Sequence, residues 1–136
     1  MALQARFGSK VTDVRAADCT TGESVGDFVY IVGNPVGGRD QVLKADPSDY
    51  DRMPAVGVVI HKPTDTTCLV QWFGETPPIF TGLSAGEIYF LGADSKVSEL
   101  PPPAAPSGIF VQPIGVALAA DKLYVRTDAN LIRRSP

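Results

Sequence analysis

The sequence has few of the side chains on which catalytic and metal sites are usually built. It contains a single histidine, His61, and two cysteines, Cys19 and Cys68, in 136 residues. One histidine excludes zinc sites that use a histidine pair, and the cysteines form no CxxC or Cys/His pattern. A metal site made from His61, Cys19 and Cys68 together is not supported by their spacing, which matches no known metal-binding motif. We therefore expect free thiols, no metal, no cofactor and no enzymatic activity.

Long apolar runs and an excess of basic charge are absent as well. No stretch approaches the roughly 18 apolar residues of a membrane-spanning helix, and residues 1–12 lack the apolar core of a secretory leader. The net charge is −3 and the pI is near 5.0, whereas a general nucleic-acid binder carries a basic face. We expect synthesis in a cytoplasm, with neither a membrane nor a nucleic acid as partner.

The remaining polar candidates are weak. His61 lies at the end of an apolar stretch beside Lys62 and Pro63, which is typical of an ordinary strand end. Asp46, Asp49 and Asp51 have a spacing that calcium sites use, but the glycine and the distal glutamate of an EF-hand loop are missing. A solvated turn is the better interpretation of these acids.

Trp72 and Phe73 are the aromatic pair with a potential binding role. Side by side, they could form a platform on which a sugar or a base stacks. A core tryptophan on a hairpin is the simpler interpretation. Both alternatives stay open at the level of the sequence.

The chain is rich in what builds short strands and turns. It has 13 glycines and 12 prolines, and 44% of its residues are apolar. Frequent breakers between short apolar runs predict an all-β fold, a small barrel or sandwich of short antiparallel strands. Apolar residues occupy both faces of the first predicted strand, which indicates burial on both sides or at an oligomer seam. The predicted strands are residues 24–33, 41–45, 54–62, 67–73, 87–91, 109–119 and 122–127.

Two regions depart from this pattern. Residues 1–18 have weak periodicity and predict an extended, mildly basic N-terminal arm, whereas residues 19–136 predict a single β domain. The proline-rich residues 100–107 predict an extended crossing on the surface of that domain. Candidate partner-binding residues on the arm are Leu3, Arg6, Phe7, Lys10 and Arg15.

A weak internal repeat joins two of the predicted hairpins. In residues 54–73 and 113–127, a proline opens or bends the first strand, a glycine follows within it, and a second strand returns after a turn. The glycines are Gly57 and Gly115. A glycine inside a strand marks a bulge or a close approach by another backbone. The repeat favours a fold with pseudo-symmetric parts.

Several stretches together resemble a pattern found in structural proteins of tailed-bacteriophage particles. The central stretch reads TGLSAGEIYFLG and is followed by a proline-rich segment, by QPIGVAL and by LYVR; VGDFVY and MPAVGV precede it. The likeness covers roughly residues 24–127 and contains no catalytic signature. These stretches are residues 81–92, 101–103, 112–118, 123–126, 25–30 and 53–58.

The resemblance implies a non-enzymatic virion protein, most like a small capsid decoration (cement) protein. Such a protein binds the major capsid protein on the capsid exterior, stabilises the shell, and is often a homotrimer at three-fold positions. A tail, neck or fibre-associated adaptor with a glycan-binding surface is the alternative within the resemblance. Outside it stands a small enzyme that uses His61, or an unrelated binding domain.

Overall fold

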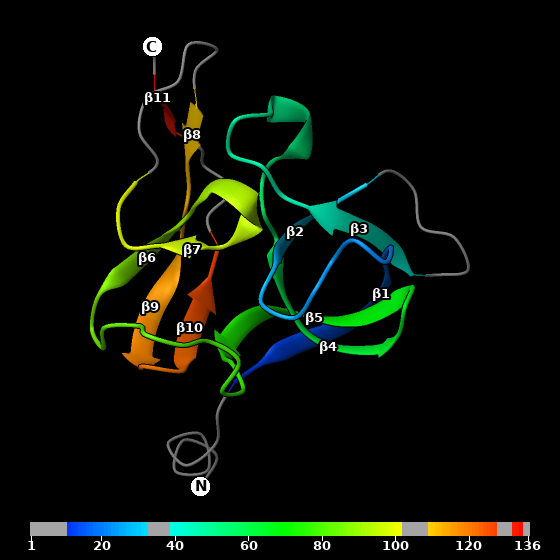
Figure 1. Ribbon diagram of the computed structural model, residues 1–136, viewed down its shortest axis with the longest axis horizontal. Helices are drawn as coiled ribbons and strands as arrows, with labels where there is room; N and C mark the ends of the chain where they lie inside the picture. The colour runs from blue at the N-terminus through cyan, green and yellow to red at the C-terminus, as the bar shows by residue number, and fades with distance from the viewer. Residues whose placement is uncertain (1–10, 33–38, 102–108, 128–131, 135–136) are drawn as a thin grey trace, which may run out of the picture.

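A computed structural model of the chain describes residues 11–32, 39–101, 109–127 and 132–134 (Figure 1). Strands make up 52% of the chain and there is almost no helix, which confirms the predicted all-β class. The strands are β1 (Asp13–Asp18), β2 (Phe28–Ile31), β3 (Asp40–Lys44), β4 (Gly57–Thr64), β5 (Thr67–Glu75), β6 (Ile88–Leu91), β7 (Val97–Ser98), β8 (Ile109–Val111), β9 (Pro113–Ala119), β10 (Lys122–Arg126) and β11 (Ile132–Arg134).

The strands form a closed barrel that continues into a second part of the same sheet. The order within one nine-stranded sheet is β1-β3-β2-β4-β5-β10-β9-β6-β7, and an additional pairing of β1 with β5 closes the first five strands into a barrel. The second part of the sheet lies beside the barrel (Figure 1). β8 and β11 form a separate two-stranded sheet.

Two barrel strands are buried on both faces. Phe28 and Val58 lie in a core between the barrel and the second part of the sheet, whereas their neighbours Val29 and Val59 lie in the barrel interior. All four side chains are fully buried. Successive residues of a strand point to opposite faces, so β2 and β4 serve two cores at once. Of the two alternatives predicted for the first strand, burial on both sides or an oligomer seam, the structure shows burial on both sides at Phe28 and Val29.

Part of the predicted arm is a barrel strand. β1 pairs antiparallel with β5, from Asp13 opposite Phe73 to Asp18 opposite Thr67, and parallel with the start of β3. The prediction of an arm extending to residue 18 is therefore wrong for these residues. Their pattern hid the strand, because Ala17 is the only buried side chain in β1 and the pairing of its backbone on both edges holds it in place.

Other predictions fall partly outside the described residues. Residues 1–10, with Leu3, Arg6, Phe7 and Lys10, lie there, as do residues 102–108 of the proline-rich crossing. The loop of acidic residues contains one 3₁₀ turn, Tyr50–Arg52, in which the Asp51 N–H donates a hydrogen bond to the side chain of Asp49. A second 3₁₀ turn, Ala93–Ser95, connects β6 to β7. A single domain over residues 19–136 stays a prediction.

Gly57 and Gly115 occupy equivalent positions, as the sequence repeat predicted. A Cβ at Gly57 would overlap the carbonyl oxygen of Gln71 on the next strand, and a Cβ at Gly115 would overlap the carbonyl oxygen of Tyr124. Each glycine also pairs on its other side, Gly57 with Val29 and Gly115 with Tyr89. The expected close approach of a neighbouring backbone is confirmed at both positions.

The repeat extends well beyond these hairpins. Before β2, the Gly26 N–H donates to Val59 O at 2.8 Å, and the Val59 N–H donates to Asp27 O at 2.9 Å. Before β6, Gly86 donates to Ala117 O at 2.8 Å, and Ala117 donates to Glu87 O at 3.0 Å. Gly26 and Gly86 share a left-handed backbone, with φ of 96° and 87°.

The sequences around these turns match as well. Residues 21–31 read TGESVGDFVYI and residues 81–91 read TGLSAGEIYFL. Each stretch places serine, glycine and an acidic residue in the same order before its strand. The match extends the repeat from the two hairpins to the turn and strand that precede each of them.

The two repeats share strand β5. In the first repeat, β1 flanks the last strand with Val14 opposite Gln71. In the second repeat, the end of β5 flanks β10 with Glu75 opposite Tyr124. The first repeat is therefore β1 to β5, and the second repeat is the end of β5 with β6, β7, β9 and β10. Only the first closes into a barrel among the described residues.

Candidate binding surface

The second repeat covers the outside of the first. Phe28 and Val58 point outward from the barrel, yet each is 0% exposed because side chains of the second repeat pack on them. We call the side of the second repeat that makes this contact its inner face. Its residues in the shared core are Tyr89, Leu91, Ala117, Leu123 and Val125. Burial of large apolar side chains in this way stabilises the fold by roughly 1.5–3 kcal/mol each.

The opposite side of the second repeat, its outer face, has no such cover in the described structure. Ile88 stands opposite Val116, and Val116 stands opposite Tyr124, so these side chains form one row across three strands. Residues two apart along a strand share a face, which adds Phe90 and Leu118. Ile88 is 54% exposed and Leu118 is 45% exposed.

A groove of about 480 Å³ opens on the outer face. Its apolar wall comes from Ile88, Pro113 and Val116, its floor includes Gly115, and Arg126 and Thr127 add polar groups. Gly115 lies opposite Tyr89 and Val125 of the inner face, so it contributes only its backbone to the groove. Apolar walls with a few polar groups are typical of surfaces that bind partners.

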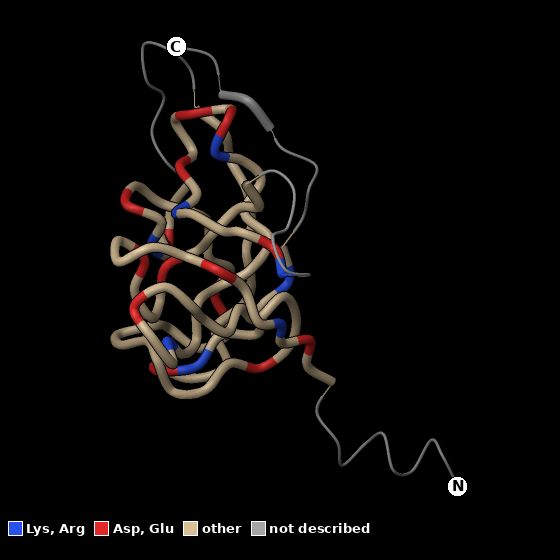
Figure 2. Tube along the Cα trace, turned by 90° about the vertical axis from the view of Figure 1, so that its right-hand side faces the viewer, with Lys and Arg blue, Asp and Glu red and all other residues tan. Residues whose placement is uncertain are grey.

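Aromatic and charged side chains adjoin this groove. The rings of Phe73 and Tyr124 meet edge to face, 5.4 Å between centroids, at the junction of β5 and β10. Lys122 Nζ lies 3.8 Å from Glu75 Oε2 on the same two strands. Over the molecule as a whole, basic and acidic residues are interspersed (Figure 2). The outer face thus combines apolar side chains with charges of both signs.

Trp72 lies elsewhere and is partly covered. The guanidinium carbon of Arg15 stands 4.3 Å above the Trp72 ring, and Arg15 donates hydrogen bonds to Asp13 at 2.9 and 3.1 Å. The hydrogen bond to Asp13 raises the pKa of Arg15. The Trp72 side chain also packs against the barrel interior. Arg15, a predicted partner-binding residue, is therefore placed on a strand where it covers one face of the ring.

Asp27 is the most deeply buried charged group in the described structure. Its carboxylate is 1% exposed, accepts a hydrogen bond from the Ser24 N–H at 2.8 Å, and lies 3.8 Å from Lys44 Nζ. Its second oxygen forms an ion pair with Lys96. Lys96 follows β6 and belongs to the second repeat, so this carboxylate ties the two repeats together.

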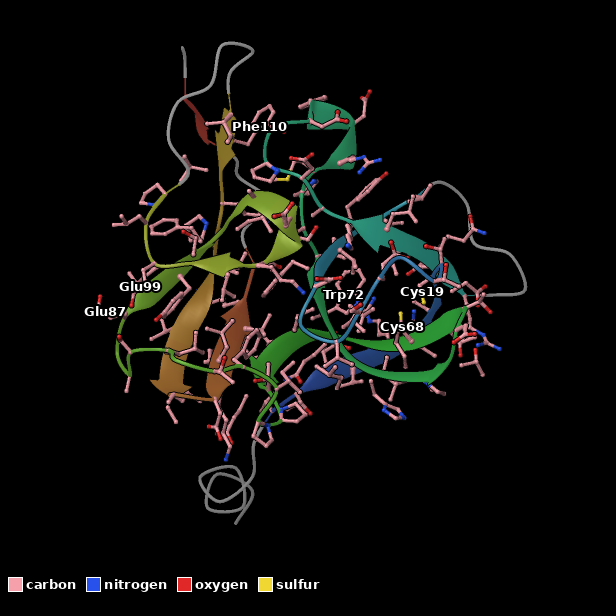
Figure 3. All side chains as sticks on the ribbon, viewed as in Figure 1. Cys19, Cys68, Trp72, Glu87, Glu99 and Phe110 are labelled. Carbon is pink, nitrogen blue, oxygen red and sulfur yellow. The ribbon has the colours of Figure 1, made fainter. Side chains whose placement is uncertain are left out.

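The candidate reactive groups do not converge. Cys19 and Cys68 lie close together and both are free thiols (Figure 3). Burial, and then the neighbouring Cys19, raise the pKa of Cys68 to about 12, so its thiol is protonated near neutral pH. His61 is exposed on β4 opposite Leu69. Among the described residues, no group of three or more His, Cys, Asp or Glu side chains could hold a metal ion.

Comparisons with known proteins do not assign the chain to a family. No protein-family model, no curated protein and no solved structure matches the chain at a significant level. Within the described part of the chain, no helix is long and apolar enough to cross a membrane.

The outer face was not singled out from the sequence. Its side chains have the apolar character of core residues, and their exposure depends on what packs on the strand. The signal that reveals the face is the alignment of TGESVGDFVYI with TGLSAGEIYFL, which pairs Phe28 with Ile88. That alignment shows one position that is covered in the first repeat and uncovered in the second.

Proposed function

We propose that this chain is a non-enzymatic structural protein of a tailed-bacteriophage particle, a decoration (cement) protein that binds the capsid exterior and stabilises the shell. Its partner is the major capsid protein, it acts as a homo-oligomer, and it is made in the host cytoplasm before joining the virion. The sequence pattern supports the class of particle. The observation that carries an assembly role is the uncovered apolar outer face, with Ile88 and Leu118, which another copy of the chain or the shell would cover.

A binding role follows from the physics of that face. Large apolar side chains exposed together on a folded protein mark a surface that is buried in an assembly. Covering Ile88 and Leu118 would add roughly 1.5–3 kcal/mol for each side chain, provided that each becomes fully buried. A protein that binds only the assembled shell stabilises it by mass action at every equivalent site. Many weak, identical contacts are enough for this purpose.

The N-terminal residues are proposed as the second contact with the capsid. Arg6 and Lys10 are basic, and no acidic residue occurs in residues 1–12. An acidic groove on the shell would attract such a segment. Deleting residues 1–10 should therefore leave the β fold intact, because β1 begins at Asp13, and should weaken binding to the shell.

Co-sedimentation with capsid shells tests the proposed function. Emptied shells stripped of accessory proteins are incubated with increasing amounts of the purified chain, and the bound fraction is measured along with the melting temperature of the shells. We expect saturation at a copy number set by the symmetry of the shell, with a higher melting temperature. Binding to tails or fibres alone would select the adaptor alternative, and no binding to any virion part would contradict the phage assignment.

A further inference from the structure

The two repeats show, within one molecule, what an outer face looks like when it is covered. The outer residues of the first repeat, Phe28 and Val58, are fully buried beneath the second repeat. Their equivalents in the second repeat, Ile88 and Val116, line an open groove. The same strand pattern therefore appears once with an occupant and once without one. The occupied case shows that a sheet of the same repeat can cover such a face, there with its inner side.

A second copy of the chain can supply such a sheet through the outer face of its own second repeat. The interior of its first repeat is closed by β1 and filled by Val29, Val59 and Val70. The inner face of its second repeat already packs on its own barrel. Among the described residues, the outer face of the second repeat is left open, with Ile88 and Leu118 exposed on it.

The charges of the outer face suit contact between like surfaces. Glu75 and Lys122 carry opposite charges on adjacent strands, and Arg126 lies near them, opposite Phe73. A face with both signs meets its own copy without the repulsion that a face of one sign would create. Side chains such as Ile88 can enter the groove of a neighbour, whose apolar wall is formed by Ile88, Pro113 and Val116.

We propose that copies of this chain associate through the outer face of the second repeat, so that the outer faces of neighbouring copies pack together around a symmetry axis. A patch that meets its own copy gives a two-fold dimer, and a ring such as a trimer forms when two parts of the face meet head to tail. This inference concerns the chain by itself and stands whether or not the capsid is its partner. It assigns Ile88, Val116 and Leu118 to the contact between copies.

Sedimentation velocity on three proteins tests the proposal. The unmodified chain is compared with Ile88→Glu, which places a charge at the centre of the outer face, and with Val25→Glu. Val25 is the control because it is 42% exposed and lies in the turn before β2 of the first repeat. Ile88 is exposed too, so both variants should fold, and circular dichroism checks this.

We expect the unmodified chain and Val25→Glu to sediment as the same oligomer and Ile88→Glu to sediment as the 14.4 kDa chain. Leu118→Glu, at a second exposed position of the same face, should repeat the dissociation. An oligomer that survives both outer-face substitutions overturns the proposal, as does an unmodified chain that is monomeric at all concentrations. If that monomer also loses shell binding on Ile88→Glu, the face belongs to the capsid and not to a second copy.

Discussion

Phe28 and Ile88 hold the same position in two copies of one strand pattern, yet Phe28 is 0% exposed and Ile88 is 54% exposed. Each begins a strand after a Ser-x-Gly-acid turn, and each stands opposite a valine that follows a close-packed glycine. The difference arises from what packs outside the strand. The first repeat has the second repeat as its cover, whereas the outer face of the second repeat is left for another molecule.

Truncating these two residues should have very different effects on stability. Phe28→Ala opens a cavity between the two repeats and is expected to lower the free energy of unfolding by about 3–5 kcal/mol. Ile88→Ala removes atoms that already contact water, so a loss below about 1 kcal/mol is expected for the dissociated chain. Urea unfolding at low protein concentration measures both. Equal losses of unfolding free energy in the two variants would contradict the burial of Phe28 and the exposure of Ile88.

The glycines inside β4 and β9 should not accept side chains. At Gly57 and Gly115 a Cβ would overlap a carbonyl oxygen of the adjacent strand, which cannot move without breaking the sheet. We expect Gly57→Val and Gly115→Val each to cost about 3 kcal/mol or more. Gly22→Val is the matched control, because its Cβ would meet only Thr20 Oγ1, at 3.4 Å. A Gly115→Val chain as stable as the control would disprove the equivalence of the two hairpins.

The ion pair between Lys96 and Asp27 should matter more than surface pairs do. Asp27 is almost fully buried, so Lys96→Ala leaves a buried carboxylate with the more distant Lys44 as its remaining cation. We expect a loss of about 1–3 kcal/mol in the free energy of unfolding. Arg52→Ala removes the exposed pair with Asp49, 3.8 Å apart, and should cost under about 1 kcal/mol. Chemical denaturation measures the free energy of unfolding of both variants. If Lys96→Ala loses no more stability than the Arg52→Ala control, the Lys96–Asp27 pair does not link the two repeats.

Cys68 should be inert in the folded chain and should make stability depend on pH. Its pKa is about 12 when folded, above the ordinary value of 9.0, so folding favours the protonated thiol. This stabilisation is complete below the ordinary pKa and is lost as the pH rises from about 9 toward 12. The unfolding free energy of the unmodified chain should therefore fall more steeply above pH 9 than that of Cys68→Ala.

Alkylation near neutral pH provides a second readout for the same thiol. Cys19 is only partly buried, whereas Cys68 is 1% exposed. Mass spectrometry after brief treatment with iodoacetamide should find the modification on Cys19, with Cys68 labelled only after unfolding. Rapid labelling of Cys68 in the native chain would contradict its protected, protonated state.

Much of the fold could be predicted from local patterns. The run from residue 67 to residue 73 alternates around Val70, and β5 occupies it. Gly57 and Gly115 stand where a backbone approaches closely, as a glycine within a strand indicates. These features depend on short stretches of sequence and on the two-residue period of strands, so they are visible without the structure.

The features that could not be predicted depend on tertiary context. β1 presents Ala17 as its buried side chain and is held by pairing with β5 and β3, so it lacks the apolar alternation of a strand. Arg15 was a candidate for partner binding, but its position above Trp72 becomes visible only when β1 and β5 are paired. The outer face could not be predicted, because Ile88 and Leu118 are apolar like core residues, and their exposure depends on whether another element packs on their strands.

The mass of the unmodified chain in solution tests the central claim most directly. Static light scattering over a range of micromolar concentrations needs no variant and no partner. An uncovered outer face that joins copies of the chain predicts a stable mass that is a multiple of the 14.4 kDa chain, with three copies matching the homotrimer expected for a decoration protein. A mass of 14.4 kDa at every concentration would contradict the account, because the outer face would then remain exposed in the free protein.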